Sequence, residues 1–247
     1  MPVDPRWFES FFESDEWLLL AQSHPAERAE AEAGFVAERL PTGARVLDVP
    51  CGTGRISVPL AERGFVVSGL DISNRVLEVA RAAAPALDLR QGDMRDLPWP
   101  DGSFDAVLNL WTAFGYFETQ AEDERVLAEA ARVLTPGGVF VLDTINQAAL
   151  LRDFRPQGWN ELDGALLLER REHDLVTGRI QSYWTFVKPG GERSEFAFDH
   201  RLYTTREYVD MLRRAGLEPT AFFGGFDGSE LTPDTWRLVI VAEKREP

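Results

Sequence analysis

The pattern of hydrophobic and polar residues changes three times along this chain. From residue 45 to residue 147, short apolar runs alternate with segments whose apolar residues recur at helical spacing. The expected strands are 46–49, 65–70, 87–91, 104–111 and 139–144. Because strands that alternate with helices are joined by right-handed crossovers, this pattern predicts a parallel sheet with helices on both faces.

Capping residues indicate where the helices of this region begin. Ser73 is suited to cap one helix, and Thr119 with Glu122 forms a capping box for the helix that precedes the fifth strand. Pro59 fits the first turn of its helix, where amide groups have no intrahelical partner. The Thr-Pro-Gly-Gly segment at 135–138 predicts a turn into the fifth strand.

Two other regions have different patterns. Residues 1–44 begin with clustered aromatic side chains and continue into a helical run over 26–40, which predicts helical packing or a lid. Residues 148–203 contain extended runs separated by Thr-Gly and Pro-Gly-Gly, which predicts an antiparallel meander of about three strands. These runs are 165–173, 179–188 and 192–203.

The C-terminal region returns to the first pattern. A helix capped by Thr204 and Glu207 and ended by Gly216 precedes two strands, near 219–223 and 236–242. The chain is therefore predicted to be one domain over residues 1–247. Its expected parts are an N-terminal helical lid (1–44), a core (45–147), a β-meander insertion (148–203) and the end of the core sheet (204–247).

Composition narrows the class of protein. A chain of 247 residues, 44% hydrophobic and 27% charged, is typical of a soluble globular domain. Its net charge of -15 argues against nucleic-acid binding. A single cysteine, with no metal-ligand spacing of acidic or histidine residues, predicts neither a disulfide nor a metal site. Residues 1–7 lack the basic start and apolar run typical of a signal peptide, and no run of roughly 18 apolar residues occurs, so a cytoplasmic location is expected. The oligomeric state stays open.

Acidic residues and glycines follow the first two expected strands. Asp48 ends the first strand, and Gly52 and Gly54 follow where the chain must turn sharply. Asp71 comes 17 residues after Gly54, at the end of the second strand, where a carboxylate can bond both hydroxyls of a ribose. The alternative for this pair is a tight turn followed by a helix-capping aspartate. Together, these residues favour a nucleoside site.

A motif with a carboxylate and a thioether follows the third expected strand. Gly92, Asp93 and Met94 follow it, beside the same edge of the sheet. Asp93 is suited to accept a hydrogen bond from an adenine amino group, and the Met94 thioether is suited to pack on the ring.

These motifs, in this order, resemble those of class I S-adenosylmethionine-dependent methyltransferases. The matching segments are Val-Leu-Asp-Val-Pro-Cys-Gly-Thr-Gly (46–54), Gly-Leu-Asp-Ile-Ser (69–73), Gly-Asp-Met (92–94), Phe-Asp-Ala-Val (104–107) and Leu-Thr-Pro-Gly-Gly (134–138). The resemblance implies an α/β, Rossmann-like fold whose seven-stranded sheet is mostly parallel with an antiparallel last strand, plus a small antiparallel β insertion. It also implies S-adenosyl-L-methionine as the cofactor.

The resemblance further implies which residues hold that cofactor. The turn lies under the methionine part, Asp71 meets the ribose, Asp93 and Met94 meet the adenine, and the end of the fourth strand faces cofactor and substrate. The implied set is Asp48, Val49, Pro50, Cys51, Gly52, Gly54, Asp71, Ile72, Asp93, Met94, Asn109, Leu110 and Trp111, with Arg28 a candidate for the cofactor carboxylate. The alternative for Arg28 is a solvated helix face, and Cys51 is expected to pack as a small apolar residue beneath the turn.

Three shorter segments resemble a subgroup that acts on small molecules and carries both an N-terminal helix and a β-meander insertion. They are 114–117, 201–203 and 226–229. This resemblance implies methyl transfer to N or O of a small-molecule acceptor. The candidate substrate contacts are Tyr116, His200, Arg201 and Tyr203, with no general base assigned. The alternatives are a half-exposed strand histidine at 200 and strand-edge pairing for the other two residues of the meander.

The expected reaction is an in-line displacement, in which the enzyme holds the acceptor atom roughly 3–3.5 Å from the methyl carbon. Two other functions compete with it. A nicotinamide-dependent oxidoreductase is disfavoured because residues 52–57 lack the third glycine of a pyrophosphate-binding turn. A cofactor-binding subunit without catalysis is the other alternative, since a fold and a binding motif do not establish turnover.

Overall fold

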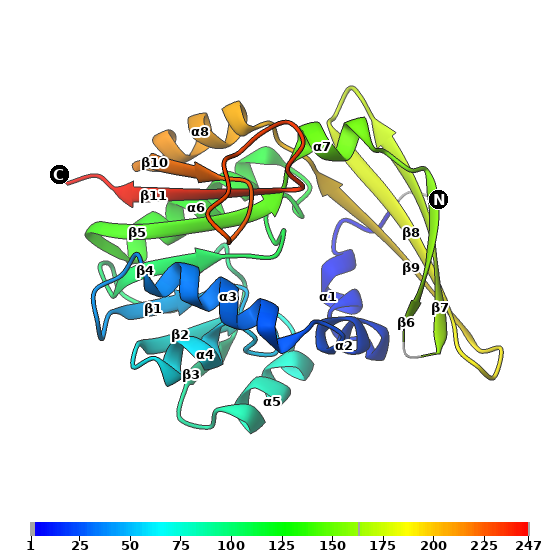
Figure 1. Cartoon of the computed structure of the whole chain (residues 1–247), viewed down its shortest axis with the longest axis horizontal. Coiled ribbons are helices and arrows are strands. Elements are labelled where there is room, and N and C mark those ends of the chain that lie inside the picture. The colour runs from blue at the N-terminus through cyan, green and yellow to red at the C-terminus, as the bar shows by residue number, and fades with distance from the viewer. Residues whose placement is uncertain (1–2, 163, 247) are drawn as a thin grey trace.

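The computed structural model describes residues 3–162 and 164–246, which form a seven-stranded sheet, a separate four-stranded antiparallel sheet and the helices around them (Figure 1). The core sheet consists of β1 (Arg45–Asp48), β2 (Val66–Asp71), β3 (Asp88–Gln91), β4 (Phe104–Asn109), β5 (Leu134–Ile145), β10 (Leu217–Phe223) and β11 (Arg237–Lys244), in the order β10-β11-β5-β4-β1-β2-β3. Strand β11 is antiparallel to both of its neighbours. The predicted fold class is confirmed.

Alternating residues of the core strands separate two hydrophobic layers. On β4, Val107 packs into one layer, while Ala106 and Leu108 pack into the other. On β11, Ile240 and Val241 divide in the same way. The first layer is covered by α6 (Gln120–Val133) and α8 (Thr205–Arg214), and the second by α3 (Ala26–Ala37) and α4 (Ser57–Glu62). Because both faces are covered, the core strands are apolar on both sides.

The helix signals in the sequence are confirmed. Ser73 Oγ accepts a hydrogen bond from the backbone N–H of Val76 at the start of α5 (Asn74–Ala83). Capping boxes form at the starts of α6 and α8. Pro59 lies in the first turn of α4, where a missing amide donor costs no intrahelical bond.

Strand β5 begins earlier than expected. Leu134 already pairs with Phe104, whereas the next paired residues are Ala106 and Val139, so the register shifts between them. Residues 135–138, predicted to be a turn before the strand, are therefore an excursion within it. Gly137 has a φ of 72°, which allows the strand to leave the ladder and rejoin it.

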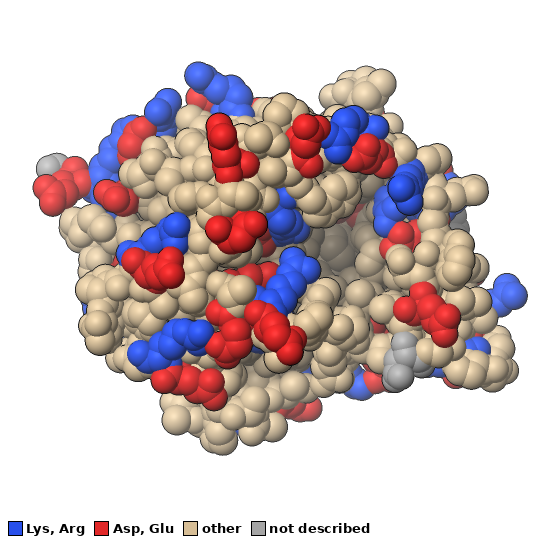
Figure 2. All heavy atoms as spheres, viewed as in Figure 1, with Lys and Arg blue, Asp and Glu red and all other residues tan. Residues whose placement is uncertain are grey.

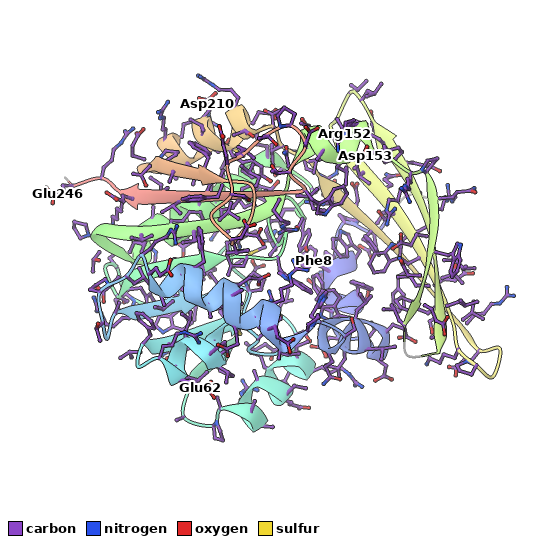
Figure 3. The ribbon with its side chains drawn as sticks, viewed as in Figure 1. Phe8, Glu62, Arg152, Asp153, Asp210 and Glu246 are labelled. Carbon is purple, nitrogen blue, oxygen red and sulfur yellow. The ribbon has the colours of Figure 1, made fainter. Side chains whose placement is uncertain are left out.

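Two short helices separate the core sheet from the second sheet. Helices α1 (Trp7–Phe11) and α2 (Asp15–Gln22) lie between these two parts of the molecule (Figure 1). Phe8 is buried there, in the region between the sheets (Figure 3). The indole N–H of Trp7 donates to the backbone oxygen of Asp199 at 3.1 Å, which ties α1 to the second sheet.

The segment between β5 and α8 contains more secondary structure than predicted. It holds α7 (Gln147–Arg152), β6 (Gln157–Leu162), β7 (Ala165–Asp174), β8 (Arg179–Val187) and β9 (Arg193–Arg201). Within the described residues the second sheet thus has four strands, β6-β7-β8-β9, where about three were expected. Strand β6 escaped prediction because it is a mostly exposed edge strand without an alternating apolar face.

The exit from the second sheet is held by a buried hydrogen bond to the core. Tyr203 is 2% exposed, and its hydroxyl donates to Asp123 Oδ2 on α6 at 2.7 Å. Asp123 is fully buried, and burial raises the pKa of its carboxyl to about 6, while the bond to Tyr203 lowers it. This contact fixes where the chain leaves β9 and enters α8.

We expect Tyr203→Phe to lower the free energy of unfolding by about 1–3 kcal/mol, because it leaves the buried Asp123 carboxyl without this partner. Urea denaturation measures the change. Tyr183→Phe is the matched control, since the Tyr183 hydroxyl bonds only to Gln181 among the described residues. Equal stability of the two variants would contradict the stabilising role assigned to the Tyr203–Asp123 hydrogen bond.

Candidate functional site

A cleft opens where the carboxyl ends of the parallel strands meet. Asp48 and Asp71 are the last residues of β1 and β2, and Leu110 directly follows β4. The predicted cofactor residues that line this cleft are Asp48, Pro50, Cys51, Gly52, Asp71, Ile72, Asp93, Met94, Leu110 and Trp111. The four others, Arg28, Val49, Gly54 and Asn109, lie outside its lining. This is the edge where open parallel sheets bind ligands.

The two glycines of the turn have different roles. Gly52 has a φ of 52°, and a Cβ on it would meet no atom within 4 Å, so its backbone is open to a ligand. A Cβ on Gly54 would lie 3.2 Å from Ala80 Cβ, so this glycine allows α5 to pack against the turn. Cys51 is buried beside the same helix, as expected for a small apolar residue.

Asp71 joins the turn to the end of β2. Its Oδ2 accepts from the backbone N–H of Gly52 at 2.8 Å, and its Oδ1 accepts from that of Ser73 at 2.9 Å. Burial raises the pKa of Asp71 to about 6, while these backbone donors lower it. The carboxylate has lone pairs beyond the two used here, so it can accept further hydrogen bonds from a ligand.

Asp48 is a second buried carboxyl in the cleft. Its Oδ2 accepts a hydrogen bond from Ser57 Oγ at 2.6 Å. Burial raises its pKa to about 7, and the nearby charge of Asp71 adds to that rise, whereas Ser57 and Arg55 oppose it. Such a perturbed acid in a cleft is characteristic of a functional site.

The polar residues at the ends of β3 and β4 make different contacts. Arg95 holds the Asp93 carboxylate through Nη2 at 2.6 Å, so this acid is oriented rather than free. Asn109 Nδ2 donates to the backbone oxygen of Val49 at 2.9 Å, which joins the ends of β4 and β1. Asn109 and Val49 therefore shape the cleft from behind its lining.

Trp111 and Thr112 adopt a left-handed backbone conformation that residues other than glycine rarely take. Their φ angles are 68° and 61°. Asp143 Oδ2 accepts from the Trp111 N–H, and its backbone oxygen accepts from the Thr112 N–H, both at 2.9 Å. Arg237 Nε donates to Asp143 Oδ1 at 2.8 Å and keeps this fully buried acid paired. Strain that is held in place so firmly is typical of functional sites.

A cluster of charge flanks Trp111 at one end of the cleft. The buried Glu32 accepts a hydrogen bond from Arg28 Nε at 2.8 Å and forms an ion pair with Arg55 at 2.6 Å. Arg55 lies 4.5 Å from the centre of the Trp111 ring and lines the cleft, whereas Arg28 lies behind it at 5.8 Å from that ring. Burial, followed by these two arginines, lowers the pKa of the adjacent His24 to about 4. Two guanidinium groups around one carboxylate leave a positive charge that suits an anionic ligand group.

The sequence analysis missed several residues that line the cleft. The N-terminal helices contribute Phe8, Phe12, Trp17 and Ala21, and other segments contribute Thr53, Arg55, Ile56, Leu70, Gly92, Ala113 and Phe117. Arg55 directly follows the predicted turn, so proximity in sequence could have indicated it. The sequence suggested aromatic walls and an N-terminal lid only in general terms, because clustered aromatics also form ordinary cores.

A second cavity of about 590 Å³ adjoins the cleft under the second sheet. The surface is recessed between the core and this sheet (Figure 2). Phe12, Trp17 and Tyr116 line both spaces, so the cavity and the cleft meet at these three aromatic side chains. The volume lies within the range of pockets for small organic ligands.

The predicted substrate residues divide between this cavity and the core. Tyr116 and His200 line the cavity. Arg201 and Tyr203 lie outside the lining of both spaces, because Arg201 Nη2 donates to the backbone oxygen of Glu118 at 3.1 Å and Tyr203 bonds Asp123. The structure thus assigns Arg201 and Tyr203 to anchoring contacts rather than to either space. Strand alternation explains why Arg201 points away when His200 points inward.

The fold is that of an α/β protein whose cleft lies where such folds bind nucleosides. A family model for a methyltransferase domain matches residues 46–138. The chain is 30% identical over 224 residues to the dTDP-3-amino-3,4,6-trideoxy-alpha-D-glucopyranose N,N-dimethyltransferase of Streptomyces venezuelae. The matched region covers 87% of this chain and 92% of that relative.

Solved structures agree with the relatives. The CcbJ methyltransferase from Streptomyces caelestis matches with a TM-score of 0.80 at 26% identity, covering 90% of this chain and 91% of that one. The structure of CalS10 with S-adenosylmethionine bound, an amino pentose methyltransferase from Micromonospora echinaspora, matches with a TM-score of 0.70 at 27% identity, covering 93% and 95%. The chain therefore belongs to the S-adenosylmethionine-dependent methyltransferases, and S-adenosylmethionine is its cofactor.

The residues of the cleft fit this cofactor. The open backbone at Gly52, the acceptor Asp71 and the net positive cluster around Arg55 match a turn contact, a ribose and a carboxylate respectively. The Trp111 indole N–H is buried in the cleft wall without a partner among the described residues, which leaves a donor for a ligand. Over the described ranges, no helix has the length and apolar character needed to cross a bilayer.

We expect Asp71→Asn to weaken binding of S-adenosylhomocysteine by about 1.5–3 kcal/mol, roughly 10- to 150-fold, because it removes the charged acceptor. Isothermal titration calorimetry measures the dissociation constant. Asp105→Asn is the matched control, because Asp105 lies on β4 outside the cleft lining and pairs with Arg45. Unchanged affinity in a folded Asp71→Asn protein would show that the ribose contact is misplaced.

Asp48→Asn should be more stable than the natural protein at pH 8. The folded-state pKa of about 7 lies above the usual 3.8, so the folded protein holds this proton more tightly and loses stability as pH rises from about 4 to 7. Urea denaturation should show a gain of about 1–3 kcal/mol at pH 8 that shrinks towards pH 4.

Asp105→Asn provides a control of opposite sign for this pH dependence. Arg45 lowers the pKa of Asp105, so its ionised form stabilises the fold and the variant should lose stability at pH 8. A gain for Asp48→Asn that is the same at every pH would contradict the assignment.

Proposed function

We propose that this enzyme transfers the methyl group of S-adenosylmethionine to a nitrogen or oxygen of a small molecule held in the cavity under the second sheet. The observation that carries the proposal is the meeting of the cleft and this cavity at Phe12, Trp17 and Tyr116. In this proposal a ligand in the cavity approaches the cofactor beside these side chains. The relatives' sugar substrates support a small acceptor.

In this proposal the cleft residues bind and orient the cofactor. Asp71 accepts from the ribose hydroxyls, and Asp93 with Met94 meets the adenine. The backbone at Gly52 supports the methionine part, and Arg55, assisted by Arg28 through their shared partner Glu32, attracts the carboxylate. When bound, S-adenosylmethionine supplies a methyl group activated by a positively charged sulfur.

The transfer is proposed to be an in-line displacement. The acceptor atom bonds the methyl carbon as the carbon–sulfur bond breaks, the electron pair stays on sulfur, and a proton leaves the acceptor for solvent. The protein's contribution is position and the exclusion of water. Tyr116, Phe12 and Trp17 provide an apolar wall where the two spaces meet. The left-handed backbone at Trp111 and Thr112 fixes the side chains that line the cleft and the cavity beside this wall.

Incubation with S-adenosylmethionine carrying a tritiated methyl group and a panel of small amines and alcohols tests this function. We expect label in a small organic product, and less of it with Asp71→Asn at subsaturating cofactor. A chiral methyl group should arrive with inverted configuration if the displacement is in-line. Binding of S-adenosylhomocysteine without transfer to any acceptor would favour a cofactor-binding subunit, and retention of configuration would exclude the single displacement.

A further inference from the structure

The wall of the second cavity is mainly aromatic. Helix α1 and the loop after it contribute Trp7, Phe11 and Phe12, and α2 contributes Trp17. Strands β8 and β9 contribute Trp184 and Phe198, and Phe198 packs on Phe11 with ring centres 5.1 Å apart. A cavity lined by a packed aromatic cluster favours an apolar ligand that can lie against its rings over a strongly hydrated one.

The charges at the edge of this cavity nearly cancel. Asp153 pairs with Arg152 at 2.5 Å, and these residues lie at the end of α7 beside the second sheet (Figure 3). Arg171 pairs with Glu169, whose side chain is 8% exposed. Arg155 is the remaining lining cation, with no ion pair among the described residues. One lining arginine without an ion pair supplies less positive charge than a diphosphate carries negative charge, so the cavity is poorly suited to bind a diphosphate.

His200 offers one directed polar contact to a ligand in the cavity. Its Nε2 lies 3.0 Å from the backbone oxygen of Phe114, and since a carbonyl only accepts, Nε2 carries the proton. The neutral ring then has a free lone pair on Nδ1, for which no partner is found among the described residues. Burial lowers the pKa of His200 to about 4, so the neutral form persists at physiological pH. The Tyr116 ring packs beside it at 5.6 Å.

We propose that the methyl acceptor is a ring-bearing apolar molecule without a phosphate group, whose N–H or O–H donates a hydrogen bond to His200 Nδ1. This inference rests on the proposed function and adds the class of acceptor to it. His200 selects a ligand with a donor, because a ligand that covers Nδ1 without bonding it loses that atom's hydrogen bond to water. The aromatic walls hold the ring, and the balanced charges provide no site for a diphosphate. In this respect the acceptor differs from the nucleotide sugar named for the Streptomyces venezuelae relative.

Binding of defined probes to the protein saturated with S-adenosylhomocysteine tests the acceptor class. The probes are 1-naphthylamine and 1-naphthol, which carry a donor on a ring, naphthalene, which lacks the donor, and dTDP-glucose, which carries the diphosphate. Calorimetry should give dissociation constants for the two donor probes that are about tenfold or more below those of the other two. Tighter binding of dTDP-glucose, or equal binding of naphthalene, would overturn the inference.

The same experiment separates the inference from the proposed function. Binding of S-adenosylhomocysteine is measured first, together with transfer of labelled methyl to any acceptor. If the protein does not bind S-adenosylhomocysteine, or transfers methyl to no acceptor, the proposed function itself is wrong. Normal cofactor binding and transfer, with a preference for dTDP-glucose, would leave the function standing and defeat only the acceptor class.

Two substitutions at His200 distinguish its two nitrogens. His200→Gln keeps an amide donor near the Nε2 position and loses the acceptor at Nδ1, whereas His200→Asn keeps an acceptor near Nδ1 and loses the bond to Phe114. We expect His200→Gln to raise the acceptor's KM by about five- to tenfold with little change in Tm. His200→Asn should retain the acceptor's KM more closely and lower Tm.

Matched controls come from His173, which lies on β7 outside the cavity lining. His173→Gln and His173→Asn should leave both the acceptor's KM and the affinity for S-adenosylhomocysteine unchanged. A merely structural role for His200 would make the acceptor's KM follow Tm in both of its variants. That result would overturn the assigned hydrogen bond.

Discussion

The paired charges of Asp143 and Arg237 hold together the parts of the molecule on which the site depends. Asp143 is fully buried on β5, and Arg237 begins β11, so the ion pair joins these two antiparallel strands. Oxygen atoms of Asp143 also accept the N–H groups of Trp111 and Thr112, and Arg237 Nη1 donates to Thr112 Oγ1 at 3.1 Å. Trp111 lines the cleft and Thr112 lines the second cavity. Breaking a buried pair of this kind leaves an uncompensated charge, so the strained turn between the two spaces depends on it.

The N-terminal helices complete both spaces at once. Trp7 is fixed to β9 through the backbone oxygen of Asp199, while Phe12 and Trp17 form part of the wall shared by the cleft and the cavity. A small displacement of these helices would therefore change the contacts of both ligands. The sequence indicated a lid or helical packing in this region, and the structure shows the packing. The lid remains a prediction, because these contacts show where the helices lie and not whether they open.

Local rules explain why the core and one side of the site could be predicted. Asp48, Gly52 and Asp71 stand at the ends of adjacent parallel strands, and sequence spacing alone brings such ends to one edge of a sheet. The substrate side depends on which way a strand faces. His200 and Arg201 are consecutive in β9, so only one can point inward, and their sequence contains no sign of which. Strand β6 was missed because it is a mostly exposed edge strand without an alternating apolar face. The shifted register of β5 was missed because pairing with β4, rather than local preference, defines it.

The two acids of the cleft oppose stability, which indicates why they are present. Burial raises the pKa of both Asp48 and Asp71, so keeping either of them ionised in the folded protein costs free energy. Burial also raises the pKa of Asp143, but there a guanidinium group compensates the charge directly. The backbone donors around Asp71 and the hydroxyl of Ser57 beside Asp48 compensate only in part. A ligand that donates hydrogen bonds to the carboxylate of Asp71 would recover part of that free energy on binding. The destabilised acid thus favours the ligand-bound form of the protein, which is the advantage of placing it at the ends of these strands.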